Sequence, residues 1–317
     1  MSAAGPVRLV YVAGAGRSGT TLLAMLLGAL PGATALGEVR HLWARGIRDN
    51  QLCGCGGPFH ECPFWQEVGD LAFGGWDRVD VDRILALQRA VDRFRSVPRQ
   101  ALGGIGGGRE AMVDEYLSAF RPIYRAAARI GGGVLVDSSK APSFLALLRR
   151  QPGIDLRVVH LVRDSRAVVY SWSRRRLRPE LRGAGPGYMA MIGARRSTAD
   201  WVANNLAIDL IGAGRGTVER VRYEALMRDP ERELRRLVGD WLASPGDGGG
   251  EDSPARIAIG TQHTVAGNPI RFQQGGITLR SDDEWMTAMP LQRRLAVAAA
   301  TWPLLLRYGY VLRSGRS

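Results

Sequence analysis

The sequence GAGRSGTT at residues 14–21 follows a run of β-branched and apolar residues, VRLVYVA, at 7–13. The run at 7–13 is long enough for one buried strand, and residues 21–30 read as a helix ended by Pro31 and Gly32. Between strand and helix, glycines let backbone N–H groups converge on phosphate oxygens, and the helix N-terminus adds its partial positive charge. The strand, the loop and the helix together predict a phosphate-binding site.

The glycine spacing from Gly14 to Gly19, G-x-x-x-x-G, is that of a Walker A loop. However, Thr20 stands where a nucleoside triphosphatase has its lysine, and the positive charge lies earlier in the loop, at Arg17. The loop therefore predicts phosphate binding without requiring a triphosphate. The residues expected to contact phosphate are Gly16, Arg17, Ser18, Gly19, Thr20 and Thr21.

Strand and helix patterns alternate along the rest of the chain. Further buried strands are expected at 133–136, 156–162 and 217–223, and helices at about 80–96, 109–130 and 229–243. This alternation predicts an α/β fold with a P-loop NTPase-like parallel sheet flanked by helices, in which ligands bind at the carboxyl ends of the strands. We expect a single domain over residues 1–317, with helical insertions at about 40–130 and 172–215 that form an acceptor pocket, and an exposed loop at 244–254.

Composition and charge narrow the class of protein. Apolar residues make up 45% and charged residues 23% of the chain, which excludes a mostly disordered protein and a collagen-like repeat. No run reaches the roughly 18 apolar residues of a membrane-spanning helix, and no signal-peptide pattern is present, so we expect no membrane span and a cytoplasmic location. The net charge of +13 favours a polyanionic partner: nucleic acid, anionic lipid or a multiply phosphorylated small molecule.

Two motifs in this sequence resemble those of the sulfotransferases that use 3′-phosphoadenosine 5′-phosphosulfate (PAPS). Their phosphosulfate loop reads [Lys/Arg]-Ser-Gly-Thr-Thr, as residues 17–21 do here, and a second loop for the 3′-phosphate has an arginine at a strand end and a serine eight positions later. Arg163 and Ser171 match that second loop. A guanidinium and a hydroxyl suit a phosphate dianion. The resemblance implies PAPS as co-substrate, with no metal required because protein cations take the place of Mg²⁺.

The resemblance also implies a general base. In the tyrosylprotein and similar Golgi-type sulfotransferases, a Gly-Glu pair after the first helix supplies it, and Gly37-Glu38 stands here, 21 residues after Arg17. Transfer of a sulfuryl group to an alcohol needs a carboxylate or imidazole within hydrogen-bond reach of the acceptor hydroxyl. Glu38 is therefore the expected base, and His41 and Asp137 are the alternatives.

Lys140 is the only lysine in the chain. Several sulfotransferase branches carry Lys-x-Pro after the middle strand, as Lys140-Ala141-Pro142 does here. A rotatable ammonium can donate to the oxygen that bridges sulfur and phosphorus, so Lys140 and Arg17 are expected to stabilise the leaving phosphate. By the same resemblance Tyr223 lies near the adenine, and Arg271 or Arg280 closes over the 3′-phosphate.

Three cysteines lie close together in a loop-like segment. Cys53, Cys55 and Cys62, with His60, offer four potential metal ligands, but C-x-C-x4-H-x-C is not a usual zinc spacing. We therefore expect no metal here and a compact loop packed by aromatic side chains, with zinc as the alternative. A constitutive disulfide is not expected in the cytosol.

The motifs together predict a PAPS-dependent sulfotransferase that acts on a small-molecule, glycan or lipid hydroxyl, or less readily on an amine. One alternative is a P-loop small-molecule kinase or NTPase, for which 133–137 resembles a Walker B strand ending in Asp137. Another is a non-catalytic nucleotide- or RNA-binding module. The arginine cluster at 174–178 lacks the interleaved aromatic residues of a nucleic-acid surface, so we expect no nucleic-acid partner.

Overall fold

The computed structural model describes residues 5–104, 108–177, 187–214, 218–242 and 256–310. The loop expected at 244–254 lies outside these ranges. Within them, no helix combines the length and the apolar character needed to cross a membrane.

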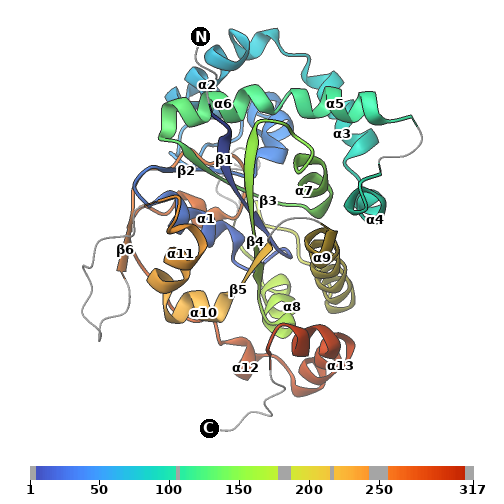
Figure 1. Cartoon of the computed structure of the whole chain (residues 1–317). Helices are drawn as coiled ribbons and strands as arrows, with labels where there is room; N and C mark the ends of the chain where they lie inside the picture. Colours follow the sequence, from blue (N-terminus) through green and yellow to red (C-terminus); the bar gives the residue numbers. More distant parts are fainter. Residues whose placement is uncertain (1–4, 105–107, 178–186, 215–217, 243–255, 311–317) are drawn as a thin grey trace.

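The centre of the fold is a sheet of five parallel strands in the order β2-β3-β1-β4-β5. β1 lies between β3 and β4, and Figure 1 shows these strands at the centre of the molecule with helices around them. The strands are β1 (Val7–Ala13), β2 (Ala33–Gly37), β3 (Val134–Lys140), β4 (Ile154–Val162) and β5 (Val218–Arg222). The predicted parallel sheet is confirmed. β2 was not predicted, because its sequence, ATALG, lacks the run of β-branched residues that marks the other strands.

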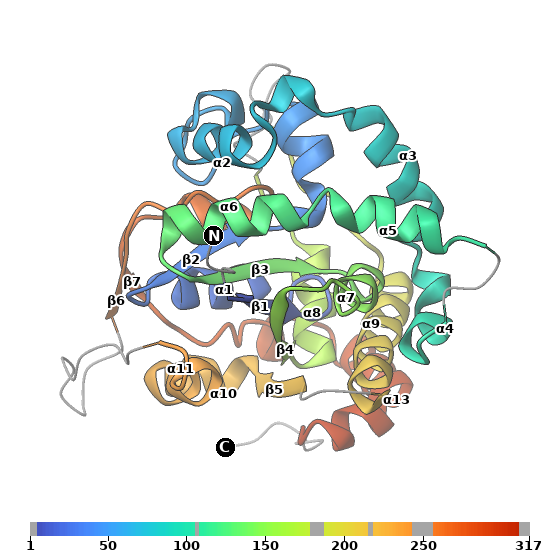
Figure 2. The ribbon, with the colours of Figure 1, turned by 45° about the horizontal axis from the view of Figure 1, so that its top comes forward.

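Both faces of the sheet are covered, as expected for parallel strands. Side chains of β1 alternate between the two faces of the sheet. Leu9 and Tyr11 belong to the apolar cluster on one face, and Val10 and Val12 belong to the cluster on the other. Figure 2 shows α5 (Glu110–Ser118) and α6 (Arg121–Gly131) on the first side and α10 (Tyr223–Arg228) and α11 (Pro230–Val238) on the second. The first side also carries α2 (Pro63–Phe73), α3 (Val81–Val91), α7 (Pro142–Leu148) and part of α9 (Ala194–Gly214), and the second α1 (Thr20–Gly28).

Helices form most of the described part of the expected insertions, but each helical pattern predicted there is divided into shorter helices. The pattern at 109–130 forms two helices, α5 and α6, because Pro122 lacks an N–H and fits only the first turn of a helix. The pattern at 80–96 forms α3, a 3₁₀ turn at Phe94–Ser96, and then α4 (Val97–Ala101). The remaining helices are α8 (Ser165–Ser173), α12 (Trp285–Ala288) and α13 (Leu291–Arg307).

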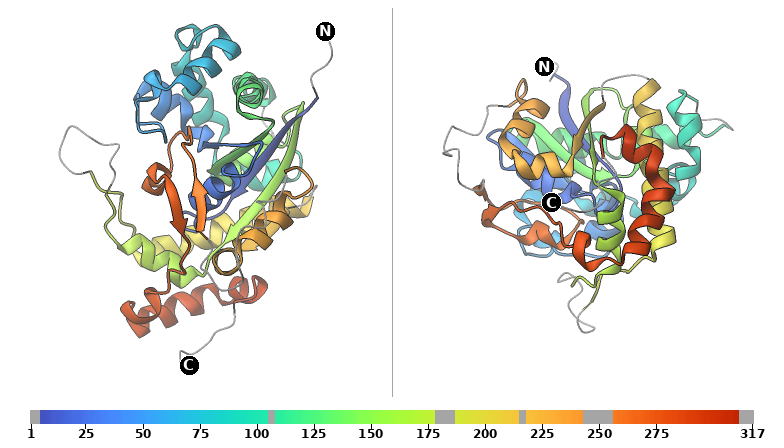
Figure 3. Two further views of the ribbon diagram at one scale, coloured as in Figure 1. Left: turned by 90° about the vertical axis from the view of Figure 1, so that its left-hand side faces the viewer. Right: turned by 90° about the horizontal axis from the view of Figure 1, so that it is seen from below.

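A carboxy-terminal segment returns to the sheet edge at β2. Residues 256–278 form the antiparallel pair β6 (Arg256–Ile259) and β7 (Gly275–Thr278), joined through an extended stretch and a 3₁₀ turn at Pro269–Phe272. Figure 3, left panel, shows this part of the chain (orange) beside the blue segment that follows β2. Val265 bridges to Gly37, so residues far apart in the chain meet at the carboxyl end of β2.

Candidate functional site

The predicted phosphate loop lies between β1 and α1, at the carboxyl end of the central strand. Gly19 precedes α1 with φ 96°, and an added Cβ there would lie 2.7 Å from the ring of Tyr223. Arg17 has φ 71°, in the left-handed region that an arginine rarely adopts. The loop is thus a turn with two residues of positive φ, and it ends at the N-terminus of α1.

The Arg17 guanidinium is a cation without an anionic partner among the described residues. Its carbon lies 4.7 Å from the ring centroid of Trp172, and none of its three nitrogens has a hydrogen-bond partner within the described ranges, although all are buried. Burial, together with the charge of Arg176, lowers the pKa of Arg17 to about 10. A buried, unpaired guanidinium is costly, and an anion bound beside it removes that cost.

Glu38 and Lys140 meet at the carboxyl ends of the neighbouring strands β2 and β3. The Lys140 ammonium donates a hydrogen bond to Oε1 of Glu38, whose side chain is 5% exposed. Burial raises the pKa of Glu38, but the charge of Lys140 and the hydrogen bond from its ammonium oppose this effect, and the net pKa lies below its ordinary value. Lys140 itself has φ 53°. The pair is therefore an ionised base beside an ammonium group.

The carboxy-terminal segment positions Glu38. The N–H of Glu38 donates to the carbonyl of Val265 at 2.7 Å, and the N–H of Val265 donates to the carbonyl of Leu36 at 2.9 Å. An added Cβ at Gly267 would lie 3.7 Å from Oε1 of Glu38. No local sequence pattern shows that residues 265–267 pair with the end of β2, so this support could not be predicted.

The two alternative bases differ from Glu38 in charge and access. Nε2 of His41 lies 3.6 Å from Oε2 of Glu38, but burial lowers the pKa of His41 to about 3, so it is neutral near pH 7. Asp137 is fully buried, and it accepts hydrogen bonds from Tyr124 and Ser139. Burial raises the pKa of Asp137 to about 6 although those bonds oppose it. His41 lines the cavity described below but is neutral, and Asp137 does not line it. Of the three, Glu38 alone is both ionised and part of the cavity lining.

Arg163 connects the two predicted loops. Its guanidinium donates to the carbonyl of Arg17 at 3.3 Å and lies 4.4 Å from the ring centroid of Tyr223. It also forms an ion pair with Asp282, at 3.0 Å between Nη2 and Oδ2. Asp282, which no sequence pattern singled out, therefore occupies the anion position beside Arg163.

One cavity of about 350 Å³ collects these groups. Of the predicted site residues, it is lined by Gly16, Arg17, Gly19, Thr20, Thr21, Glu38, Lys140, Arg163, Ser171 and Tyr223. Its five cationic side chains are Arg17, Arg45, Lys140, Arg163 and Arg176, and its two carboxylates are Glu38 and Asp282. The excess of positive charge suits a ligand with several negative charges.

A second cavity, of about 270 Å³, adjoins the first. The two share Gly16, His41, Lys140 and Trp172, so Lys140 lies at the boundary between them. The second cavity adds polar residues, small or apolar residues and one further tryptophan. The polar residues are Arg40, Ser139, Ser197, Asp200 and Asn204, and the tryptophan is Trp201.

The structure places three predicted residues differently from the others. Ser18 is fully buried and does not line the larger cavity. Arg271 does not line it either, because its guanidinium is buried and donates to the carbonyls of Thr264 and Leu52 at 2.7 and 2.8 Å. Arg280 is exposed and lies outside the lining. The carboxy-terminal residues that do line the cavity are Gly267, Asn268, Ile270 and Asp282.

The segment 53–62, which carries the three cysteines, lies against the carboxy-terminal stretch at His263. Cys53, Cys55 and Cys62 gather as the sequence spacing allows, but the imidazole beside them is His263. His60 points elsewhere, and its Nε2 lies 2.8 Å from the carbonyl of Ile47.

Comparison with known proteins supports the fold. No family model matches the chain, and no curated protein matches it. The sulfotransferase domain of the Synechococcus olefin synthase is 20% identical, the match covers 99% of this chain and 98% of that chain, and the TM-score is 0.51. The sulfotransferase domain from the curacin biosynthetic pathway is 16% identical over 93% of this chain and 98% of that chain, with a TM-score of 0.48. This chain therefore has the fold of a sulfotransferase domain, which confirms at the level of the fold the resemblance inferred from its motifs.

Proposed function

We propose that the protein is a PAPS-dependent sulfotransferase that transfers the sulfuryl group to a hydroxyl acceptor. The observation that carries the proposal is that one cavity joins two arginine-bearing loops, at Arg17 and Arg163, with the buried Glu38 and its partner Lys140, which is half-buried. The fold of a sulfotransferase domain and the excess of cations in the cavity support it.

In this proposal the donor lies along the loops of the larger cavity. The loop at Gly16–Thr21 and the unpaired Arg17 guanidinium bind the 5′-phosphosulfate through backbone N–H groups and charge. Arg163 and Ser171 bind the 3′-phosphate, which displaces the Asp282 carboxylate from Arg163. Tyr223, whose ring lies beneath Arg163, flanks the nucleoside. Arg271 takes no part in this binding; instead, Gly267 and Asn268 close that side of the cavity.

The chemistry proposed is in-line displacement at sulfur. The acceptor oxygen attacks the sulfur while the bond between sulfur and the bridging oxygen breaks, and the electron pair of that bond leaves with 3′,5′-diphosphoadenosine (PAP). The acceptor proton passes to the Glu38 carboxylate. Lys140 shifts its hydrogen bond from Glu38 to the bridging oxygen, and Arg17 offsets the charge that develops on the phosphate.

We place the body of the acceptor in the second cavity, with its reacting hydroxyl extending past Lys140 and His41 into the first cavity, which Glu38 lines. Polar groups such as Asp200 and Asn204 together with the indoles of Trp172 and Trp201 suit a hydroxylated small molecule with an apolar part. A glycan, lipid or natural-product hydroxyl fits this description.

The location of Asp137 disfavours the kinase alternative. That alternative needs Asp137 to reach a magnesium ion at the nucleotide phosphates, but Asp137 is fully buried and lines neither cavity. The RNA-binding alternative predicts affinity that falls steeply with salt and does not depend on a 3′-phosphate.

Calorimetric titration with PAP and with ADP, each with and without Mg²⁺, tests the proposal. We expect tight, metal-independent binding of PAP and weak binding of ADP. Preference for ADP with magnesium would instead support a kinase. Transfer of labelled sulfate from PAPS to a panel of alcohols then identifies the acceptor class.

A further inference from the structure

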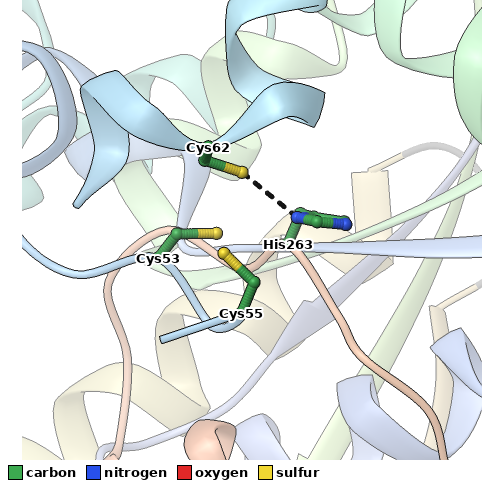
Figure 4. Close-up of side chains that lie close together, drawn as sticks. All are labelled: Cys53, Cys55, Cys62 and His263. Carbon is green, nitrogen blue, oxygen red and sulfur yellow. Dashed lines mark hydrogen bonds between the residues drawn. The ribbon is translucent and has the colours of Figure 1, made fainter. Parts of the chain in front are cut away.

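We propose that Cys53, Cys55, Cys62 and His263 bind one structural zinc ion that clamps the carboxy-terminal segment beside Glu38. The ligand atoms of the four residues, three Sγ atoms and one imidazole nitrogen, all lie within 4.8 Å of one another. Figure 4 shows the three sulfurs and the imidazole converging on one point, with Nδ1 of His263 3.1 Å from Sγ of Cys62.

The donor set favours zinc over other metals. Three thiolates and one imidazole are a tetrahedral set that proteins use for structural zinc, whereas magnesium and calcium take oxygen ligands. A structural site also has all four positions filled by protein. Cys53 and Cys62 are each 1% exposed, and Cys55 and His263 are half-buried, so the four residues enclose the site.

The surrounding residues hold the ligands in place. The ring of Phe64 stacks on His263, with centroids 5.2 Å apart and an angle of 13° between the planes. The N–H of Cys53 donates to the carbonyl of Gly57 at 2.8 Å, and the N–H of Gly56 donates to the carbonyl of Cys53 at 2.9 Å, so hydrogen bonds on both sides fix the backbone of the first cysteine. Because these contacts orient the ligand atoms, the cluster is more than three neighbouring thiols.

The turn between Cys53 and Cys55 lies very close to the backbone at residues 262–264. An added Cβ at Gly54 would lie 2.3 Å from Oγ1 of Thr264 and 2.6 Å from the carbonyl of Gln262, so only glycine fits there. The N–H of Gly54 donates to the carbonyl of Thr264 at 2.9 Å. Consequently the C-G-C turn lies directly against the stretch that carries His263.

This placement connects the metal to the catalytic end of the sheet. His263 lies two residues before Val265, whose carbonyl accepts the N–H of Glu38, and four before Gly267, which lines the donor cavity. Trp65 adds a hydrogen bond from Nε1 to the carbonyl of His263 at 2.9 Å. A metal that ties 53–62 to His263 therefore limits movement of the segment that holds Glu38. The ion has no place in the transfer chemistry.

Metal analysis of the intact protein tests the inference without depending on any activity. Protein produced in zinc-supplemented medium is desalted and its metals are measured by mass spectrometry; we expect about one zinc per chain. Cobalt substituted for zinc should give the visible bands of tetrahedral thiolate coordination. Iron in place of zinc, or zinc far below one per chain with three freely alkylated thiols or a disulfide, would overturn the proposal.

Two histidine variants give a matched comparison. His263→Ala and Cys62→Ser should lose most of the zinc, whereas His60→Ala should keep it, because His60 lies in the same motif but outside the cluster. Circular dichroism confirms that each variant is folded. Equal zinc loss in His60→Ala and His263→Ala would contradict the assignment of ligands. The titration with PAP tests the proposed function separately, so absence of zinc would not by itself contradict that function.

Discussion

Lys140, the chain's only lysine, donates a hydrogen bond to Oε1 of Glu38 across the ends of β3 and β2. The two residues are 102 positions apart in sequence, and they meet because adjacent parallel strands end at the same edge of the sheet. Each side chain sets the state of the other: the ammonium keeps the buried carboxylate ionised, and the carboxylate holds the ammonium in the cavity. An ionised base and a mobile proton donor are thus placed side by side before any substrate binds.

Replacement of the base should stop transfer while leaving donor binding intact. We expect Glu38→Gln to lower kcat by roughly 10²–10⁴-fold, because the amide cannot accept the acceptor proton. PAP affinity should change little, since Glu38 is not expected to contact phosphate. Steady-state assays with labelled PAPS and calorimetry with PAP measure the two effects. Glu115→Gln, which alters an exposed ion pair with Arg83, is the control. Normal turnover in Glu38→Gln would remove Glu38 from the mechanism.

The lone lysine gives a second prediction. Lys140→Arg preserves charge, but the planar guanidinium cannot rotate between Glu38 and a bridging oxygen as an ammonium can. The larger side chain must also start from a backbone with φ 53°. We expect kcat to fall by about 10²-fold or more, as when an oxyanion-stabilising group is lost, while the protein stays folded. The rate of sulfuryl transfer in a single turnover, measured by rapid quench, reports the chemical step directly. An active Lys140→Arg enzyme would refute the argument from the lone lysine.

Arg163 should discriminate donors by their 3′-phosphate. Removal of a charged hydrogen-bonding group is expected to weaken PAP binding by about 10–100-fold in Arg163→Ala, with ADP binding nearly unchanged. Asp282→Asn should act in the opposite direction and tighten PAP binding by a few-fold, because Asp282 now pairs with Arg163 where the phosphate is expected. Calorimetry with both nucleotides measures each effect. Equal losses for PAP and ADP in Arg163→Ala would mean that Arg163 only supports the loop at Arg17.

Much of the site could be predicted because its residues follow strands. The sequence places Arg17, Glu38, Lys140 and Arg163 just after apolar runs or a glycine turn, and parallel strands bring such positions to one edge. For Arg17, Lys140 and Arg163 the shared cavity follows from this rule. Glu38 follows β2, a strand that was not predicted, so only the motif resemblance indicated it, and the resemblance also gave the proposed roles.

The remaining features depend on contacts between distant segments, which local patterns do not encode. His263 joins the cysteines from about 200 residues away, whereas the sequence motif offered His60. β2 is short and rich in alanine, so pairing with β3, rather than propensity, makes it a strand. Asp282 reaches Arg163 from beyond β7, in a stretch without any motif.

The pH dependence of transfer should show that the base needs no deprotonation near neutral pH. The pKa of Glu38 is held below its ordinary value of about 4.3, so activity should stay level through neutral pH and fall only at lower pH. His41, with a pKa of about 3, should add no inflection near pH 6.5. Because both pKa values are lowered on folding, the unfolded chain binds protons more readily, and stability also falls as the pH drops. Profiles of kcat/KM, with thermal unfolding at each pH, separate the two effects. An inflection of kcat/KM near pH 6.5 in the folded protein would contradict the lowered pKa of both groups.

Arg271 provides the sharpest contrast between the sequence-based expectation and the structure. As a donor contact it would affect PAP affinity, but its buried guanidinium instead joins Leu52 to Thr264, next to the proposed zinc ligands. Arg271→Met should therefore lower the free energy of unfolding by about 2–4 kcal/mol, because the buried carbonyl of Thr264 and the half-buried carbonyl of Leu52 lose a charged donor. At a temperature where the variant is folded, PAP affinity should stay within about threefold, less than the tenfold that 1.4 kcal/mol represents. Arg280→Met, at an exposed position, is the control and should change neither quantity. A stable Arg271→Met protein with weak PAP binding would restore Arg271 to the donor site.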